Sequence, residues 1–191
     1  MFVDYITVML VNMVAGLTLL GLYFLVGLTR PTQKHWAAAM AMVGLVALAT
    51  GLHMTLTWPM PRLAKVNLQW ANIAFGEMSV LFGVLFLGAA LAVAKGWSLI
   101  GVGVYAFFAG AAAIVVGLRV AQLGLTQRPE LSAAGFILGG LGGVLACPIV
   151  ALRHKALRAI GAIVLFVAAA VWALVGYGSY WMHLQSFAEL K

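Results

Sequence analysis

Residues 131–152 read LSAAGFILGGLGGVLACPIVAL and contain no charged side chain. A helix of about twenty such residues crosses the roughly 30 Å hydrocarbon core of a bilayer at about 1.5 Å per residue. The rest of the chain has the same character, since 65% of its 191 residues are hydrophobic and 8% are charged, against about 25% charged in ordinary soluble domains. The mean hydropathy is +1.11. These values predict an integral membrane protein.

Six apolar stretches of this kind occur along the chain, at residues 5–28, 36–56, 73–94, 97–118, 131–152 and 157–181. The segments between them are short, so neighbouring helices are expected to pack antiparallel. The first stretch follows Asp4 and lacks a basic region before it, which favours a retained helix over a cleaved signal peptide. We therefore predict one all-α domain over residues 1–191, a bundle of six transmembrane helices.

The basic residues predict the orientation of this bundle. An even number of spans places both termini on one side, together with the connections that contain Arg62, Lys65 and Arg128. The short connections of the other side carry Arg30, Lys34, Lys95, Arg153, Lys155 and Arg158. Because the side richer in basic residues stays in the cytoplasm, both termini are expected on the outer face of the cell membrane. Basic residues scattered between apolar runs are typical of a topology signal, which argues against nucleic acid as a partner.

The longest connection is expected to form a lid on the outer face. It lies within residues 51–77, GLHMTLTWPMPRLAKVNLQWANIAFGE. Pro59 and Pro61 cannot continue the second helix and favour a stiff turn. Trp58 and Trp70 bracket the turn, and tryptophan suits the headgroup region of a bilayer. The predicted lid comprises these four residues and Asn72.

Two short motifs in this stretch carry a family resemblance. TWPMP at residues 57–61, followed by NIAFGE at residues 72–77 and an apolar run, resembles a family of small bacterial and archaeal membrane proteins known as domain-of-unknown-function family 981. The resemblance implies a multi-span membrane protein. It implies no activity, cofactor or site residue.

Four polar side chains are expected near the outer end of four different helices: His53, Glu77, Arg119 and His183. Glu77 is the only acidic residue within a predicted span, and ionisable groups inside a membrane are candidates for function. Helical spacing adds Thr50 and Thr57 to the face of His53, and Tyr180 to that of His183. We predict that these residues gather in an outward-facing polar pocket, with His53 and Glu77 opposed beneath the lid. The corresponding function is a non-catalytic accessory or small-ligand-binding protein.

Two other function classes stay open at this stage. His53 and His183 would serve as axial ligands of haem b in a membrane redox protein. Met54, Met60 and Met78 lie nearby in the sequence, and methionine is a soft ligand, so copper is the other metal that this site would bind. A small transporter is a further alternative. The sequence has no nucleophile elbow, phosphate-binding loop or zinc motif that would favour an enzyme.

Glycines mark one face of the fifth predicted helix. Gly135, Gly139 and Gly143 recur every four residues, so the helix presents a nearly bare face to a neighbour. The neighbour is expected to be another helix of the bundle, a second copy of the chain or another membrane subunit. On this interpretation Gly139→Leu overpacks the contact and costs about 1–3 kcal/mol.

Overall fold

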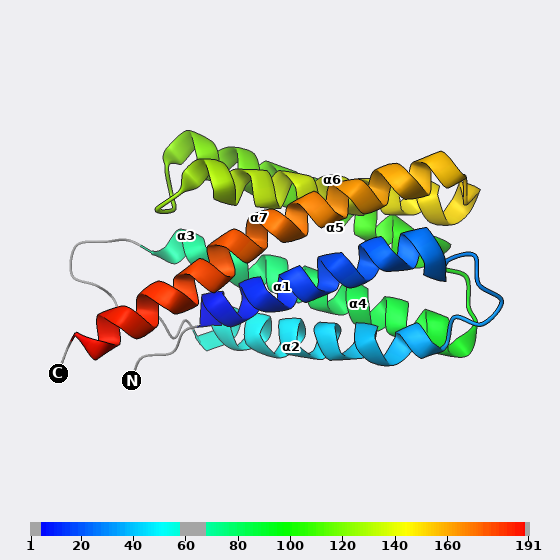
Figure 1. The fold of residues 1–191 in the computed structure, drawn as a ribbon, viewed down its shortest axis with the longest axis horizontal. Coiled ribbons are helices and arrows are strands. Elements are labelled where there is room, and N and C mark those ends of the chain that lie inside the picture. Colours follow the sequence, from blue (N-terminus) through cyan, green and yellow to red (C-terminus); the bar gives the residue numbers. More distant parts are fainter. Residues whose placement is uncertain (1–4, 58–67, 190–191) are drawn as a thin grey trace.

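The computed structural model describes residues 5–57 and 68–189, and every regular element among them is a helix (Figure 1). In chain order the elements are α1 (Tyr5–Leu22), the π-helix η1 (Tyr23–Gly27), α2 (His35–Thr57), α3 (Gln69–Ala71), the π-helix η2 (Asn72–Glu77), α4 (Met78–Lys95), α5 (Ile100–Leu123), α6 (Pro129–Leu152) and α7 (Lys155–Ala188). α1 runs directly into η1, and α3, η2 and α4 form one continuous helical segment.

Six helical segments of the described chain are long and apolar enough to cross a membrane, which confirms the predicted number of helices. Their ends differ from the predicted ones where a helix extends beyond its apolar run. α7 continues from Trp181 to Ala188, because the polar residues there break the apolar run without breaking the helix. α5 continues past Leu118 to Leu123 and ends at Gly124, whose backbone is left-handed (φ 61°), a common helix stop.

The helices associate in an order that the chain order does not reveal. α5 packs along α6, α2 packs along α4, and α7 crosses the molecule in contact with α1 and α6. Although α4 and α5 are consecutive, they share little contact. Figure 1 shows the α5–α6 hairpin above the α1, α2 and α4 helices, with α7 running diagonally between the two groups.

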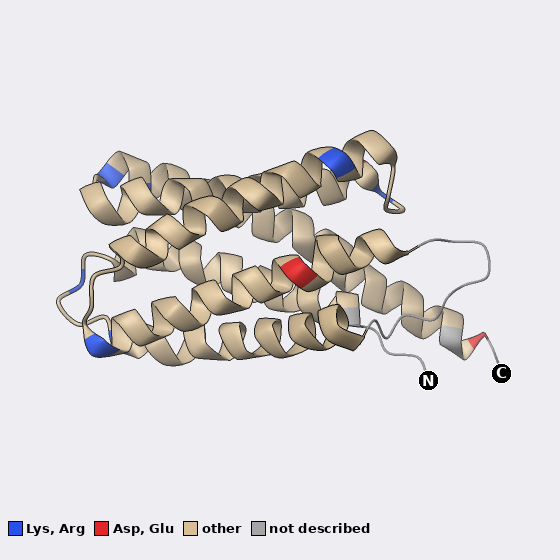
Figure 2. Ribbon diagram, turned by 180° about the vertical axis from the view of Figure 1, so that it is seen from behind, with Lys and Arg blue, Asp and Glu red and all other residues tan. Residues whose placement is uncertain are grey.

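Basic residues lie at the two ends of this bundle, as Figure 2 shows. The start of α1 and the end of α7 lie at the same end, here called the terminal end, as an even number of helices requires. The turns at the opposite end connect α1 to α2, α4 to α5 and α6 to α7. Those turns and the adjoining helix ends hold the six basic residues that the sequence assigns to the cytoplasmic side.

Glycine lets the backbones of α5 and α6 approach each other closely. A Cβ atom added to Gly140 would lie 2.5 Å from the carbonyl oxygen of Gly110, and one added to Gly143 would lie 2.8 Å from that of Ala106. On α5, Gly103 and Gly117 likewise abut α6, so glycines seven residues apart line one contact. The expected use of glycine for close helix packing is therefore seen within the bundle, mainly between α5 and α6.

A second close contact of this kind joins α2 to α4. A Cβ atom on Gly83 would lie 2.5 Å from the amide nitrogen of Leu48, and one on Gly51 would lie 2.8 Å from that of Val80. Gly44 faces the same helix, since a Cβ atom added to it would lie 2.9 Å from the amide nitrogen of Leu87. The two glycine contacts hold α2–α4 and α5–α6 as separate pairs, which leaves α1 and α7 to join them.

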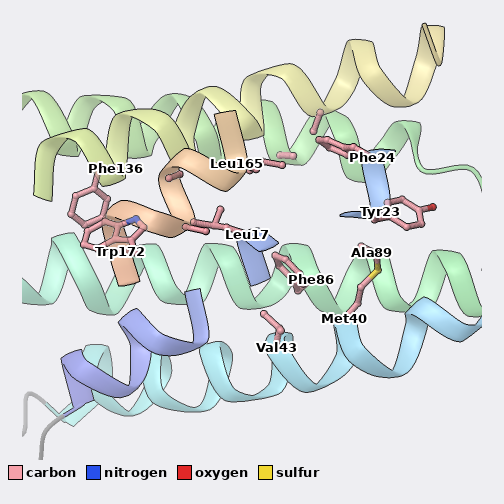
Figure 3. Packing of buried hydrophobic residues seen from close by; sticks show 14 of the residues in the cluster. Leu17, Tyr23, Phe24, Met40, Val43, Phe86, Ala89, Phe136, Leu165 and Trp172 are labelled. Carbon is pink, nitrogen blue, oxygen red and sulfur yellow. The ribbon is translucent and has the colours of Figure 1, made fainter. Parts of the chain in front are cut away.

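Large buried side chains from several helices fill the space where the two pairs meet (Figure 3). Trp172 of α7 is completely buried and meets the ring of Phe136 on α6 edge to face, with ring centroids 5.0 Å apart. Leu17, Phe86 and Leu165 continue the core along the bundle and are each at most 4% exposed. α7 thus supplies the aromatic anchor that ties the α5–α6 pair to the rest.

Arg158 at the start of α7 secures the end of the first transmembrane segment. Its Nε donates a hydrogen bond to the carbonyl oxygen of Phe24 at 2.7 Å, and its Nη2 donates to the carbonyl oxygen of Leu25 and, at 3.3 Å, to the hydroxyl of Thr29. The last carbonyls of a helix lack intrahelical partners, so a forked cation is well suited to them. This residue, which the sequence marked only as a topology signal, is a structural link between α7 and η1.

Candidate functional site

His53 and Glu77 do not face each other across the contact between α2 and α4. That contact runs through Gly51 on α2 and Gly76 on η2, where a Cβ atom on Gly51 would lie 3.0 Å from the carbonyl oxygen of Gly76. His53 is two residues beyond Gly51, about 200° around the helix, so it points away from α4. Both His53 and Glu77 are exposed on the outer surface of the bundle. The prediction that these two side chains face each other is therefore wrong.

The hydroxyl groups of the threonines near His53 form hydrogen bonds within α2. The hydroxyl of Thr57 lies 3.1 Å from His53 Nδ1, and the hydroxyl of Thr50 donates to the carbonyl oxygen of Val46 at 2.7 Å. Such local bonds are what a hydroxyl forms on a helix when no other partner is offered. The stripe at Thr50, His53 and Thr57 exists, but it does not turn into the bundle as expected.

The other predicted pocket residues lie on α5 and α7. Arg119 is exposed near the terminal end of α5 and donates to Gln122 Oε1 at 3.0 Å. His183 is half-buried in the last turns of α7, and Tyr180 is 38% exposed. Of the predicted lid, Trp58, Pro59 and Pro61 fall outside the described residues.

The remaining lid residues, Trp70 and Asn72, lie at the start of the third transmembrane segment. The ring of Trp70 lies 6.2 Å from that of Phe75, which places the indole against its own helix. Two buried oxygens of this region, Thr55 Oγ1 and Asn72 Oδ1, have no hydrogen-bond partner among the described residues. Both surround Gly76, 3.0 Å and 2.6 Å from the position of its missing Cβ. The buried polar atoms of this stretch thus belong to Thr55 and Asn72 rather than to His53 and Glu77.

A cavity lies instead at the centre of the bundle, between α4 and the α5–α6 hairpin. Its volume is about 80 Å³, and its walls come from α1, α4, α5, α6 and α7. The walls are almost entirely apolar; they include Met13, Leu81, Phe82, Ala109, Gly139 and Trp172. None of His53, Glu77, Arg119 and His183 lines it. The cavity that the structure offers is apolar and lies between the helices, where the sequence predicted a polar one at the outer face.

A second apolar cavity of about 40 Å³ continues the first toward the opposite end of the bundle. Both cavities are lined by Leu20, Leu85, Phe86 and Ala106, so they lie end to end along α4 and α5. Protein interiors are usually packed with few voids larger than a water molecule. Two adjoining voids at the sparse α4–α5 contact therefore mark a place that can hold an apolar guest.

Gly139 and Trp172 give the larger cavity its distinctive features. No atom lies within 4 Å of a Cβ added to Gly139, so this glycine borders empty space. The two other glycines of the predicted packing face do meet neighbours, since Gly135 abuts the indole of Trp172 and Gly143 abuts α5. The expectation that Gly139→Leu overpacks a helix contact is therefore corrected, because its side chain would enter the cavity.

Trp172 adds an unused hydrogen-bond donor to the walls. Its side chain is fully buried, and its indole nitrogen has no acceptor among the residues that the structure describes. A buried donor without a partner is uncommon and calls for an explanation such as a bound molecule. The sequence did not predict that Trp172 lines a cavity, because this residue lies within a long apolar run.

The described residues offer no cluster of three or more His, Cys, Asp or Glu side chains that could hold a metal ion. Cys147 is a free, half-buried thiol on α6, in the segment that packs against Gly103 of α5. The haem or copper site predicted at His53 and His183 stays a prediction.

Comparison with known proteins identifies a family and no activity. The profile of a family described as protein of unknown function (DUF981) matches residues 1–186, nearly the whole chain. The chain belongs to the DUF981 family. No curated protein and no solved structure matches it. The family assignment agrees with the resemblance carried by TWPMP and NIAFGE, and the chemistry of this DUF981 protein has to be inferred from its own residues.

Proposed function

We propose that this DUF981 protein is a multi-pass membrane protein that holds a small lipid-soluble molecule in the central cavity, without catalysis of its own. Six helices long and apolar enough to span a membrane support the location. The observation that supports binding is the apolar cavity between α4 and α5–α6, bordered by the bare backbone of Gly139 and by the unpaired indole of Trp172. This central cavity, and not the polar pocket predicted at the outer face, is the ligand site that we propose.

The walls define the chemistry of such a molecule. An apolar cavity excludes water and accepts hydrocarbon, as engineered cavities of roughly 150 Å³ do with benzene. The larger cavity, at about 80 Å³, suits a short chain or part of a ring, and the rest of the ligand would extend along the adjoining 40 Å³ or between α4 and α5. An oxygen acceptor on the ligand would satisfy the N–H of Trp172. We therefore propose a slim hydrocarbon that carries one carbonyl or hydroxyl group.

Binding is expected to raise the thermal midpoint of the purified protein in detergent. With 2-decanone as the probe, the midpoint should increase with concentration, because a ligand that binds only the folded state stabilises it. Decane should give a smaller increase, since it cannot accept a hydrogen bond from Trp172. Gly139→Leu should abolish the response to both probes by filling the cavity.

Gly178→Leu provides a matched control. Gly178 lies on α7, also has no atom within 4 Å of its missing Cβ, and does not line either cavity. Both substitutions replace glycine by leucine in a helix, with the same propensity gain of about 1 kcal/mol. If Gly139→Leu responds to 2-decanone as fully as Gly178→Leu does, the cavity is not the binding site. In Trp172→Phe, decane and 2-decanone should act alike.

The orientation of the bundle is tested by cysteine labelling. In a Cys147→Ser background, a cysteine at Arg128 should react with an impermeant maleimide added to intact cells, and one at Lys155 should react only after permeabilisation. Arg128 precedes α6 at the terminal end, and Lys155 begins α7 at the opposite, more basic end. The reverse pattern would place both termini in the cytoplasm.

The redox alternative is separated from this function by an absorption spectrum. A protein purified from cells with haem b bound through His53 and His183 would show intense bands that change on addition of dithionite. No feature of the described residues favours that alternative, or transport, over the binding of an apolar molecule.

A further inference from the structure

Glu77 and Arg119 are opposite charges at the same level of the bundle. Glu77 lies eighteen residues before Lys95 at the end of α4, and Arg119 lies nineteen residues after Ile100 at the start of α5. The turn between Lys95 and Ile100 is short, so the two charges stand about 27 and 29 Å above it at about 1.5 Å per residue. Both side chains are exposed.

Each charge belongs to a row of exposed apolar side chains. On the α4 segment the row contains Ile73, Glu77, Val84 and Leu91, whose apolar members are 41–53% exposed. On α5 it contains Val104, Phe108, Val115 and Arg119, whose apolar members are 45–68% exposed. The spacings of four and seven residues keep each row on one side of its helix.

The two rows lie on the same side of the molecule. On α4, Phe82 is directed toward Gly16 of α1, on the other side of the helix from the row. On α5, Gly103, Gly110 and Gly117 face α6, again away from the row. α1 and α7 cover the side of the bundle seen in Figure 1. Since the rows point away from α1 and from α6, we assign both to the opposite side.

Neither charge is neutralised within the described chain. Glu77 forms no hydrogen bond or ion pair with a described residue, and Arg119 donates one hydrogen bond, to Gln122, out of the five that a guanidinium can make. Exposed charges within a transmembrane segment are costly, and they are usually paired with another group. A partner that presents a cation opposite Glu77 and an anion opposite Arg119 would neutralise both charges.

We propose that a second copy of the chain covers this side, so that α4 of one protomer packs on α5 of the other. In a two-fold dimer with its axis along the membrane normal, every residue keeps its level and each contact occurs twice. Glu77 of each protomer then meets Arg119 of its partner, and the apolar rows meet each other. This surface differs from the glycine face of α6, which α5 and α7 already cover, and its use does not depend on ligand binding.

Charge reversal tests the ion pair directly. The dimer fraction would be measured by single-molecule photobleaching of labelled protein in liposomes at increasing dilution. Glu77→Arg and Arg119→Glu should each raise the dissociation constant by about tenfold or more, because each sets like charges against one another. The double variant should restore dimers, since it exchanges the two charges without losing the pair. Gel filtration and thermal midpoints would verify that each variant is folded.

A disulfide experiment tests the arrangement of the helices without changing the charges. In the Cys147→Ser chain, Leu91→Cys and Val104→Cys would be placed on separate, differently tagged copies and expressed together. Leu91 and Val104 stand at the same level, four residues from Lys95 and Ile100. A disulfide-linked heterodimer is expected from this pair. The control pair Leu174→Cys and Val167→Cys, exposed on α7, should give none. A monomeric wild-type protein, or single charge reversals that leave the dimer fraction unchanged, would overturn the proposal.

Discussion

Gly140→Leu is expected to force α5 away from α6 and to cause a large loss of stability. A Cβ atom at this position would lie 2.5 Å from the carbonyl oxygen of Gly110 and 3.1 Å from the amide nitrogen of Ile114. Both are backbone atoms, so no side-chain rotation relieves the overlap. The cost should reach or exceed the upper end of the about 1–3 kcal/mol that is typical of overpacking.

The adjacent residue supplies the control for this prediction. Gly139→Leu makes the same chemical change one position earlier, where the new side chain enters the cavity. Thermal midpoints in one detergent should therefore fall sharply for Gly140→Leu and stay the same or rise for Gly139→Leu. Equal losses for the two variants would mean that α6 does not present Gly140 to α5.

Arg158→Met is expected to loosen the junction between α7 and the first transmembrane segment. The substitution keeps an unbranched, flexible side chain and removes the donors that reach the carbonyl oxygens of Phe24 and Leu25 and the hydroxyl of Thr29. Hydrogen bonds that involve a charged group are each worth about 1.5–3 kcal/mol, so the loss should be of at least that order. Thermal or denaturant unfolding in detergent measures it.

Two further variants identify the cause of that loss. Arg158→Lys keeps the charge but lacks the planar fork, so it should recover only part of the stability. Lys155→Met removes an exposed positive charge one turn earlier on α7 and should have little effect. If Lys155→Met is as unstable as Arg158→Met, net charge at the helix start matters and the specific contacts do not.

The sequence predicted the architecture well because the relevant signal is long and local. An uncharged stretch such as residues 131–152 has only one way to satisfy its backbone in hydrocarbon, which is a helix. The six stretches, their short connections and the even number of helices followed from that rule alone. The helix ends were predicted less well, because a helix does not stop where polarity begins: α5 continues to Leu123 and ends at Gly124, and α7 continues through polar residues to Ala188.

The site was not predictable in the same way. A soluble helix shows its inner face by the alternation of apolar and polar residues, but these helices are apolar all round. The few polar residues were therefore assigned to the interior, and the structure places His53 and Glu77 on the outer surface. Glycine spacing likewise predicted a close contact without its partner, and it placed Gly139 in the contact that the structure gives to Gly140.

The sequence by itself determined the number of helices, their antiparallel order and the basic character of one end, because each depends on composition within a segment or on the parity of the segments. Only the tertiary structure decided that Gly140 touches α5 while Gly139 borders a cavity, that Trp172 closes that cavity, and that Arg158 holds η1. These facts depend on how each helix is rotated about its own axis, and that rotation is set by contacts between segments far apart in the chain.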